Sequence, residues 1–255
     1  MVRNKKVPAK SSFSRKAKKS PNGAENHNGN GNGNGRIKKA YEFHDIDLHP
    51  RTDGQAEALE SIENNDISII SGPPGTGKSH IAVAYGLQQF TKGKYKRIIF
   101  TRPCVEAYGE NLGFLPGDFN DKILPYMRPI MDILCKYMQR EELEIFIKNE
   151  FIITLPLAYQ RGITFENAYV VGDEFQNTIP EQVHMFLTRM GVGSKVVITG
   201  DPNQSDITVT NGLNDAIKRF DGVKDIGVVK MGPQDIVRHR LVSVVDDKYV
   251  ELLTK

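Results

Sequence analysis

The stretch SIISGPPGTGKSHIAVAYG, residues 68–86, decides the fold because a glycine-rich turn here joins a β-branched strand to an amphipathic helix. The turn has the spacing G-x-x-x-x-G-K-[ST], in which backbone N–H groups surround phosphate groups at a helix N-terminus. Lys78 would add a charge near the β- and γ-phosphates, and the Ser79 hydroxyl would bind Mg²⁺. We therefore expect ATP and Mg²⁺ as ligands of the loop residues Gly72, Pro73, Pro74, Gly75, Thr76, Gly77, Lys78 and Ser79.

Short apolar runs alternate with helix-length segments on both sides of this loop. Strands are expected at 66–71, 97–101, 151–154, 168–173, 195–201 and 225–231, and helices at about 52–64, 78–91, 120–139, 180–190, 212–220 and 233–252. Several of the strands are apolar on both faces, as buried parallel strands are. The pattern predicts an α/β fold with a mainly parallel sheet flanked by helices, and ligands beyond the carboxyl ends of the strands.

The first part of the chain has a different composition. Residues 1–36 include an Asn- and Gly-rich run that cannot bury enough apolar surface to fold, so we expect a disordered tail before a domain at 37–255. Residues 1–39 hold eleven Lys and Arg against one acid, whereas the rest holds 23 bases and 30 acids. The basic tail either attaches to nucleic acid or keeps the protein in solution, and composition leaves both readings open.

Composition also bears on the compartment. The chain contains no apolar run of the roughly 18 residues that a membrane-spanning helix needs, and its basic start lacks the apolar segment of a secretory signal. Its two cysteines, Cys104 and Cys135, do not have metal-ligand spacing, which suits a reducing environment. We expect a cytoplasmic protein without a membrane partner.

Two further strands end in polar residues that suit hydrolysis. The run NAYVVGDEFQN places Asp173 and Glu174 after an apolar strand. One carboxylate would hold Mg²⁺ through its shell, and the next would orient or deprotonate the attacking water. The run VITGDPNQSD places Gln204 after another strand, where it could sense the γ-phosphate. Together with the loop, these residues predict ATP hydrolysis.

With these residues assembled, the chain resembles the PhoH family of P-loop ATPases, whose core is similar to one RecA-type domain of superfamily-one helicases. The resemblance covers about residues 40–250, and its most specific stretch is TRPCVEAYGENLGFLPGDFNDKILPYMRPIMD at 101–132. PLAYQRGITFENAYVVGDEFQN, TRMGVGSKVVITGDPNQSD and DIVRHRLV are similar to later motifs of the family. The resemblance implies a RecA-like fold, ATP hydrolysis, association with single-stranded RNA or DNA, and assembly into rings, expected to be hexamers.

The resemblance also suggests roles for single residues. It implies that Gln55 lies on the adenine side, that Asp173 and Glu174 form the Walker B pair, and that Gln204 is the sensor. Two positions depart from the family's pattern. Gly172 and Phe175 stand where an aliphatic residue and an alanine are usual.

A single RecA-like domain leaves one side of the γ-phosphate exposed, and an arginine from a neighbouring subunit usually meets the transition-state charge there. By similarity to the family's last motif, we expect this residue to be Arg238 or Arg240, ahead of Arg161 and Arg102. The aromatic and proline residues of 107–131 could stack on bases or pack an insertion against the sheet, and packing is favoured.

Three functions share the predicted ATP site. The first is a helicase-like translocase or remodeller of single-stranded nucleic acid, more often RNA than DNA. The second is a nucleotide-gated nucleic-acid-binding scaffold with little turnover. The third is an ATP-driven remodeller of proteins. The sequence favours the first.

Overall fold

The chain's computed structural model describes residues 46–103, 119–207, 209–238 and 241. The predictions for the tail at 1–36, for Arg240 and for residues 107–118 of the aromatic segment fall outside these ranges. Met127 and Ile130, which belong to the rest of the aromatic segment, are buried in a hydrophobic core.

Six parallel strands form one sheet in the order β3-β2-β4-β5-β1-β6. They are β1 (Ile67–Ser71), β2 (Arg97–Thr101), β3 (Ile152–Thr154), β4 (Ala168–Gly172), β5 (Lys195–Gly200) and β6 (Ile226–Lys230). Each lies in a run that was expected to be a strand, because β-branched residues in short apolar runs are the strongest signal for a buried strand. The registers align these strands so that their carboxyl ends share one edge.

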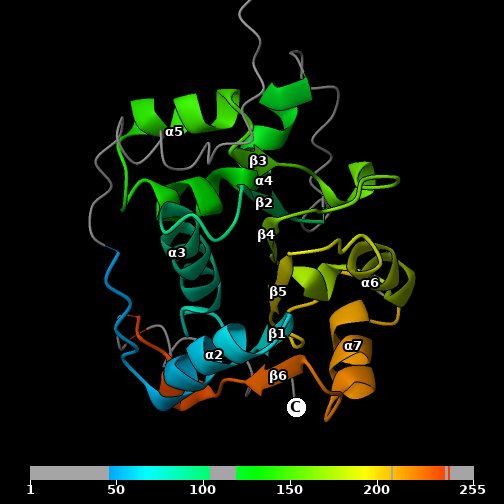
Figure 1. Cartoon of the computed structure of the whole chain (residues 1–255). Coiled ribbons are helices and arrows are strands. Elements are labelled where there is room, and N and C mark those ends of the chain that lie inside the picture. Colours follow the sequence, from blue (N-terminus) through cyan, green and yellow to red (C-terminus); the bar gives the residue numbers. More distant parts are fainter. Residues whose placement is uncertain (1–45, 104–118, 208, 239–240, 242–255) are drawn as a thin grey trace, which may run out of the picture. The chain divides into compact units, whose positions relative to one another are not determined.

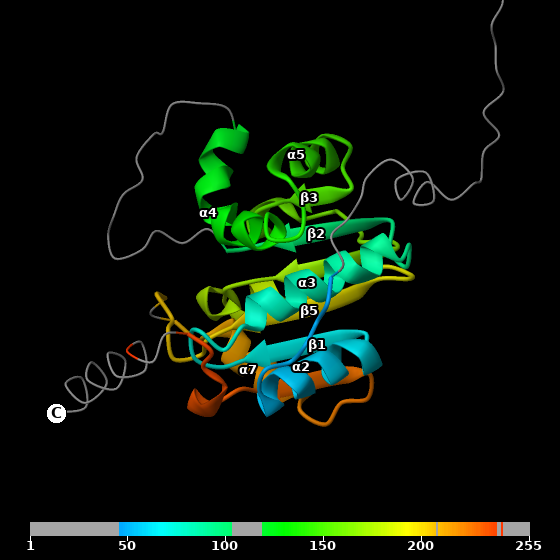
Figure 2. The same ribbon diagram turned by 90° about the vertical axis from the view of Figure 1, so that its left-hand side faces the viewer.

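Helices cover both faces of the sheet (Figures 1 and 2). One core packs beneath α2 (Asp53–Asn64), α3 (Lys78–Thr91), α4 (Phe119–Leu134) and α5 (Arg140–Lys148), and the other beneath α6 (Pro180–Leu187) and α7 (Gly212–Phe220). Neighbouring strand residues point to opposite cores, as Val170 and Val171 do, which explains the continuously apolar strands. Within the described ranges, no helix is long and apolar enough to cross a bilayer.

Two helix predictions need correction. The helix expected at 120–139 ends at Leu134, and a separate helix, α5, follows. Glu142 marks the start of α5, because its carboxylate accepts the Gln139 backbone N–H at 3.0 Å and so caps the first turn. A helix beginning at 233 is wrong: Pro233–Asp235 forms a single 3₁₀ turn, after which Ile236 is extended.

The strand order places the loop motifs side by side. Both β1, which precedes the phosphate-binding loop, and β4, which delivers the acidic pair, are hydrogen-bonded to β5. The loops after β1, β4 and β5 therefore converge at one edge, as the RecA-like interpretation predicted.

Lys195 fixes the opposite end of this arrangement. It begins β5, is only 5% exposed, and donates to backbone carbonyls at the end of α2: Ile62, Glu63 at 3.2 Å and Asn65 at 2.6 Å. These carbonyls have few other partners at a helix end, so the ammonium caps the helix. Burial lowers the pKa of Lys195 to about 8.

We expect Lys195→Met to lower the free energy of unfolding at pH 7 by about 1–3 kcal/mol, because buried carbonyls lose their donor. The gap should widen between pH 8 and pH 10.5, where the unfolded lysine still holds a proton that the folded one has lost, so that only the wild type gains stability. Urea unfolding at pH 7 and pH 9.5 measures both effects, with Lys96→Met at an exposed lysine as the control. A gap that stays constant or shrinks with pH would contradict this assignment.

Candidate nucleotide site

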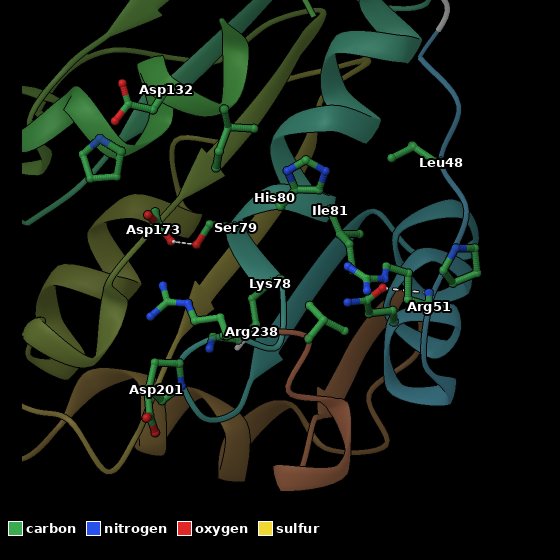
Figure 3. A pocket seen from close by; sticks show the side chains of 18 of the residues that line it. Leu48, Arg51, Lys78, Ser79, His80, Ile81, Asp132, Asp173, Asp201 and Arg238 are labelled. Atoms are coloured by element: carbon green, nitrogen blue, oxygen red, sulfur yellow. Dashed lines mark hydrogen bonds between the residues drawn. The ribbon is translucent and has the colours of Figure 1, made fainter. Parts of the chain in front are cut away.

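A cavity of about 630 Å³ opens at the carboxyl edge of the sheet (Figure 3). The loop after β1 forms its floor, and further walls come from residues 47–51, from α4 and from the loops after β2, β4 and β5. Ser79, Asp173, Asp201 and Arg238 lie around Lys78 at one end of the view, whereas Leu48, Arg51 and Ile81 lie at the other. The polar end suits phosphates, and the end with aliphatic side chains suits a base.

The loop conformation depends on two glycines. Gly75 and Gly77 have φ values of 88° and 87°, in the left-handed region that favours glycine. Gly77 directly precedes α3, so the loop enters the helix with its backbone N–H groups at the helix N-terminus. Pro73 and Thr76 support the turn, because the Thr76 hydroxyl donates to the Pro73 carbonyl at 3.0 Å. The predicted loop residues therefore form one compact anion-binding turn.

Lys78 points into this turn. Its Nζ donates to the Gly72 carbonyl at 2.6 Å and to the Pro73 carbonyl at 2.8 Å. Burial lowers the pKa of Lys78, although the nearby carboxylates of Asp201, Glu174 and Asp173 act in the opposite direction. The loop carbonyls hold the ammonium where a phosphate oxygen could take their place.

Asp173, which follows β4, connects to α3 and β5 at the polar end of the cavity, where Mg²⁺ is expected; this part is called the metal end below. Its Oδ1 accepts hydrogen bonds from Ser79 Oγ at 2.7 Å and from Thr199 Oγ1 at 2.5 Å, and the residue is 2% exposed. Because the Ser79 hydroxyl donates to Asp173, its oxygen lone pairs remain available to a cation.

These residues fit Mg²⁺ that arrives with a nucleotide. In the part of the chain that the structure describes, there is no group of three or more His, Cys, Asp or Glu that could form a protein-only metal cage. Mg²⁺ usually takes one or two protein ligands together with phosphate oxygens and water. Ser79 and Asp173 would supply the protein side of such a shell.

Glu174 occupies a strained position beside Asp173. Its φ of 59° is left-handed, which is uncommon for a residue with a side chain. Arg102 Nη2 donates to Glu174 Oε1 at 2.8 Å, and Gln176 Nε2 donates to Glu174 Oε2 at 2.5 Å. Both carboxylate oxygens therefore have a protein donor. The Arg102 side chain also lies by Asp173, with Nε 3.2 Å from Oδ2.

The two departures from the family pattern explain each other. A Cβ atom at Gly172 would lie 2.4 Å from a ring carbon of Phe175. Phe175 is fully buried and packs against Phe186, with ring centroids 4.9 Å apart. The glycine makes room for the aromatic ring, so the end of β4 stays tightly packed.

Gln55 links the base end to the loop. Its Nε2 donates to the Thr76 carbonyl at 2.9 Å, and its Oε1 accepts the Arg51 backbone N–H at 2.9 Å. The residue lines the cavity but is only 5% exposed. Its amide braces the loop in this arrangement, and its place on the adenine side of the site stays a prediction.

Arg238 lies in the cavity of its own chain. Its side chain packs on Gly75, where an added Cβ would be 2.8 Å from Arg238 Cδ, and the Val237 backbone N–H donates to the Gly75 carbonyl at 3.0 Å. Asp235 fixes this segment, because its carboxylate accepts the N–H groups of Gly54 at 3.0 Å and Gly232 at 2.8 Å. Arg238 therefore lines the cavity of its own chain, and its supply to a neighbouring subunit stays a prediction.

The remaining predicted residues have different positions. Gln204 is exposed and lines the cavity, with its backbone N–H bonded to the Asp201 carbonyl at 3.0 Å. Arg161 is exposed and does not line the cavity. Arg240 lies outside the described residues.

Sequence reasoning missed two side chains and misjudged a third. Thr199 is a buried hydroxyl after the apolar run of β5, which indicates a polar partner, but the sequence does not identify Asp173 as that partner. Gln176 follows the acidic pair by two residues and was overlooked. Arg102 was considered only as a residue for a neighbouring subunit, whereas it pairs with the acids of its own chain.

The chain is similar to known proteins of one family. A family model described as PhoH-like protein matches residues 47–250. A PhoH-like protein of Bacillus subtilis (strain 168) is 43% identical over 204 residues, which are 79% of this chain and 64% of that protein. A PhoH-like protein of Mycobacterium tuberculosis (strain ATCC 25618 / H37Rv) is 44% identical over 204 residues, 79% of this chain and 58% of its own.

Further similarities are of the same kind. Protein PhoH of Escherichia coli (strain K12) is 38% identical over 195 residues, 75% of this chain and 55% of its own length. The chain spans about 55–64% of the length of these three relatives. Among solved structures, the large terminase from a thermophilic bacteriophage has a TM-score of 0.48 and 12% identity, over 79% of this chain and 50% of that chain.

We expect Gly172→Ala to lower the free energy of unfolding by about 2 kcal/mol, because the new methyl group overlaps the Phe175 ring. The cost should fall by at least about 1 kcal/mol in a Phe175→Ala background, where the ring is absent. Denaturant unfolding of both single variants and the double variant measures this coupling. Additive costs would show that the two residues are independent.

Proposed function

This chain belongs to the PhoH-like protein family, and from that premise we propose that it is an Mg²⁺-dependent ATPase that acts in a ring on single-stranded nucleic acid. The observation that carries the hydrolytic part is the Asp173 carboxylate bonded to Ser79 of the phosphate-binding loop, with Glu174 next to it. A loop, a cation ligand and a water-orienting acid at one cavity are the parts that ATP hydrolysis requires.

The residues divide the chemistry between them. Backbone N–H groups of the loop and the Lys78 ammonium would bind the β- and γ-phosphates, after Lys78 exchanges its loop carbonyls for phosphate oxygens. Ser79 and Asp173 would hold Mg²⁺, which when bound neutralises phosphate charge. Glu174 would orient the water and receive its proton.

Two further cavity residues, Gln204 and Arg238, are proposed to act near the γ-phosphate. Gln204 lines the cavity after β5, where its exposed side chain could follow the loss of the γ-phosphate. Arg238 lines the cavity of its own chain. This position supports a role for its guanidinium within the same subunit, as a positive charge facing the phosphates. Arg240 is proposed as the residue that a neighbouring subunit supplies.

Assembly and substrate rest on the motif resemblance and the charge distribution. We propose that unwinding or translocation uses neighbouring copies of this RecA-like domain, arranged in a hexamer. The basic residues of 1–39 suit a polyanion, and the family resemblance favours RNA over DNA. ATP-driven remodelling of a protein is the outcome expected if nucleic acid does not change turnover.

A second candidate function is a nucleotide-gated scaffold with little turnover. The paired oxygens of Glu174 favour it, because in this arrangement Arg102 and Gln176 occupy the positions from which a water would be oriented. The two functions differ in rate, not in the nucleotide they bind.

We expect Glu174→Gln to lower ATP turnover by about a hundredfold or more, because the amide cannot accept the proton of the attacking water. Binding of a fluorescent ATP analogue should change little. Phosphate release with and without single-stranded RNA, single-stranded DNA and duplexes measures turnover, and Glu144→Gln at an exposed glutamate of α5 is the control.

Stimulation by single strands supports the motor. Negligible wild-type turnover with intact ATP-dependent RNA binding would favour the scaffold, and stimulation only by an unfolded protein would favour the protein remodeller. Wild-type turnover that survives Glu174→Gln would contradict the assignment of Glu174.

Removing residues 1–36 tests the basic tail. If these residues attach to nucleic acid, RNA affinity should fall and the slope of log affinity against log salt should become shallower, because fewer counterions are released. Filter binding at several salt concentrations measures both. An unchanged affinity and slope would leave the tail a solubilising role.

A further inference from the structure

Arg102 joins both acidic residues to helix α4. At the end of β2, its Nη2 donates to Glu174 Oε1 at 2.8 Å, and its Nε lies 3.2 Å from Asp173 Oδ2. Its Nη1 donates to the backbone carbonyl of Tyr126 on α4 at 2.8 Å. Solvent screens the contact between Arg102 and Asp173 weakly, because their side chains are only 14% and 3% exposed, whereas Glu174 is 43% exposed.

These contacts bear on what Glu174 can do. A carboxylate that orients or deprotonates a water must offer that water an oxygen, and a charge-assisted hydrogen bond competes strongly for it. Arg102 holds one oxygen of Glu174, and Gln176 holds the other. With both donors in place, the carboxylate is oriented toward protein groups.

Of the two donors, Gln176 is the more firmly fixed. It is 3% exposed, and its Oε1 accepts the Asp201 backbone N–H at 3.1 Å. It also fits closely against β5, because a Cβ at Gly200 would lie 2.5 Å from Gln176 Oε1. Of the two donors, Arg102 is therefore the one that can move away from Glu174.

Arg102 is incompletely satisfied where it stands. Its Nε is buried, and among the described residues that N–H has no acceptor in hydrogen-bond alignment, although Asp173 Oδ2 is 3.2 Å away. A buried donor without an aligned acceptor is rare and marks strain or a functional group. One nitrogen, Nη2, thus hydrogen-bonds an acid, Nη1 bonds the Tyr126 carbonyl, and the contact with Asp173 depends on charge.

The same guanidinium affects the metal end. Asp173 Oδ1 already accepts from Ser79 and Thr199, which leaves Oδ2 as the oxygen with room for a cation's water shell. Arg102 Nε faces that oxygen. A cation shell and the guanidinium would compete for the same lone pairs.

We propose that Arg102 is a positioning residue that restrains the acidic pair of its own chain, and that hydrolysis requires its guanidinium to release Glu174. The proposal rests on the ATPase function given above. It replaces the role in a neighbouring subunit that the sequence suggested for Arg102 with a role inside one subunit. Through Tyr126, the position of α4 would determine how firmly Glu174 is held.

Arg102→Met tests the restraint, because methionine fills similar space without charge or donors. We expect turnover without nucleic acid to rise at least about threefold, with the KM for ATP changed by less than about twofold, since the change acts on the water-orienting step. Arg97→Met, at the exposed first residue of the same strand, is the matched control and should leave both constants unchanged.

A second readout is independent of turnover. Binding of a fluorescent ADP analogue at increasing Mg²⁺ should reach its midpoint at about threefold lower Mg²⁺ in Arg102→Met, because Asp173 no longer shares its oxygen with a guanidinium. If wild-type turnover is absent, the proposed ATPase function fails, whereas this Mg²⁺ shift still measures the pairing of Arg102 with Asp173.

A fall in turnover in Arg102→Met with unchanged Mg²⁺ dependence would show that Arg102 stabilises the transition state, and the proposal would be wrong. Unchanged turnover and unchanged Mg²⁺ dependence would make the pairing a static ion pair, which also overturns it. If thermal melting shows that Arg102→Met does not fold, Arg102→Lys takes its place. One ammonium cannot reach Glu174, Asp173 and Tyr126 together, so the same changes are expected at smaller size.

Discussion

One carboxylate oxygen holds the site together. Asp173 Oδ1 accepts a hydroxyl from the start of α3 and a hydroxyl from β5, and thereby ties the phosphate-binding loop to two strands. Because Asp173 is buried, losing either hydroxyl would expose a charge to a medium that solvates it poorly. The positions of Lys78, of the metal end and of Glu174 all follow from this junction.

Much of this fold could be predicted from the sequence because local chemistry and global architecture agree. The phosphate-binding loop motif predicts a strand–turn–helix unit, and runs of β-branched residues predict the other strands. The acidic pair could be placed at the cavity because parallel strands end at one edge. Helix α5 is absent from the sequence prediction because its first capping residue, Gln139, is the last residue of the helix expected at 120–139, and its partner Glu142 lies beyond that helix.

The partners of the site residues could not be predicted in the same way. Which acid a guanidinium meets depends on strand order, and Arg102 meets both acids only because β2 pairs with β4. The brace that Gln55 makes to Thr76 depends on where α2 docks. The fit of Gly172 to Phe175 needs a ring position that sequence spacing does not contain. Such side-chain contacts depend on the tertiary structure, and a single sequence motif does not predict them.

The docking of the last described segment on the first has a consequence for how the fold opens. Asp235 binds the start of α2 at Gly54, 181 residues away in sequence, and Val237 binds the loop at Gly75, so distant segments form adjoining walls of one cavity. Local opening of a fold usually begins in segments with few buried contacts. A nucleotide bound in this cavity would contact both walls and stabilise their attachment to each other. Its loss would therefore make it easier for either wall to detach.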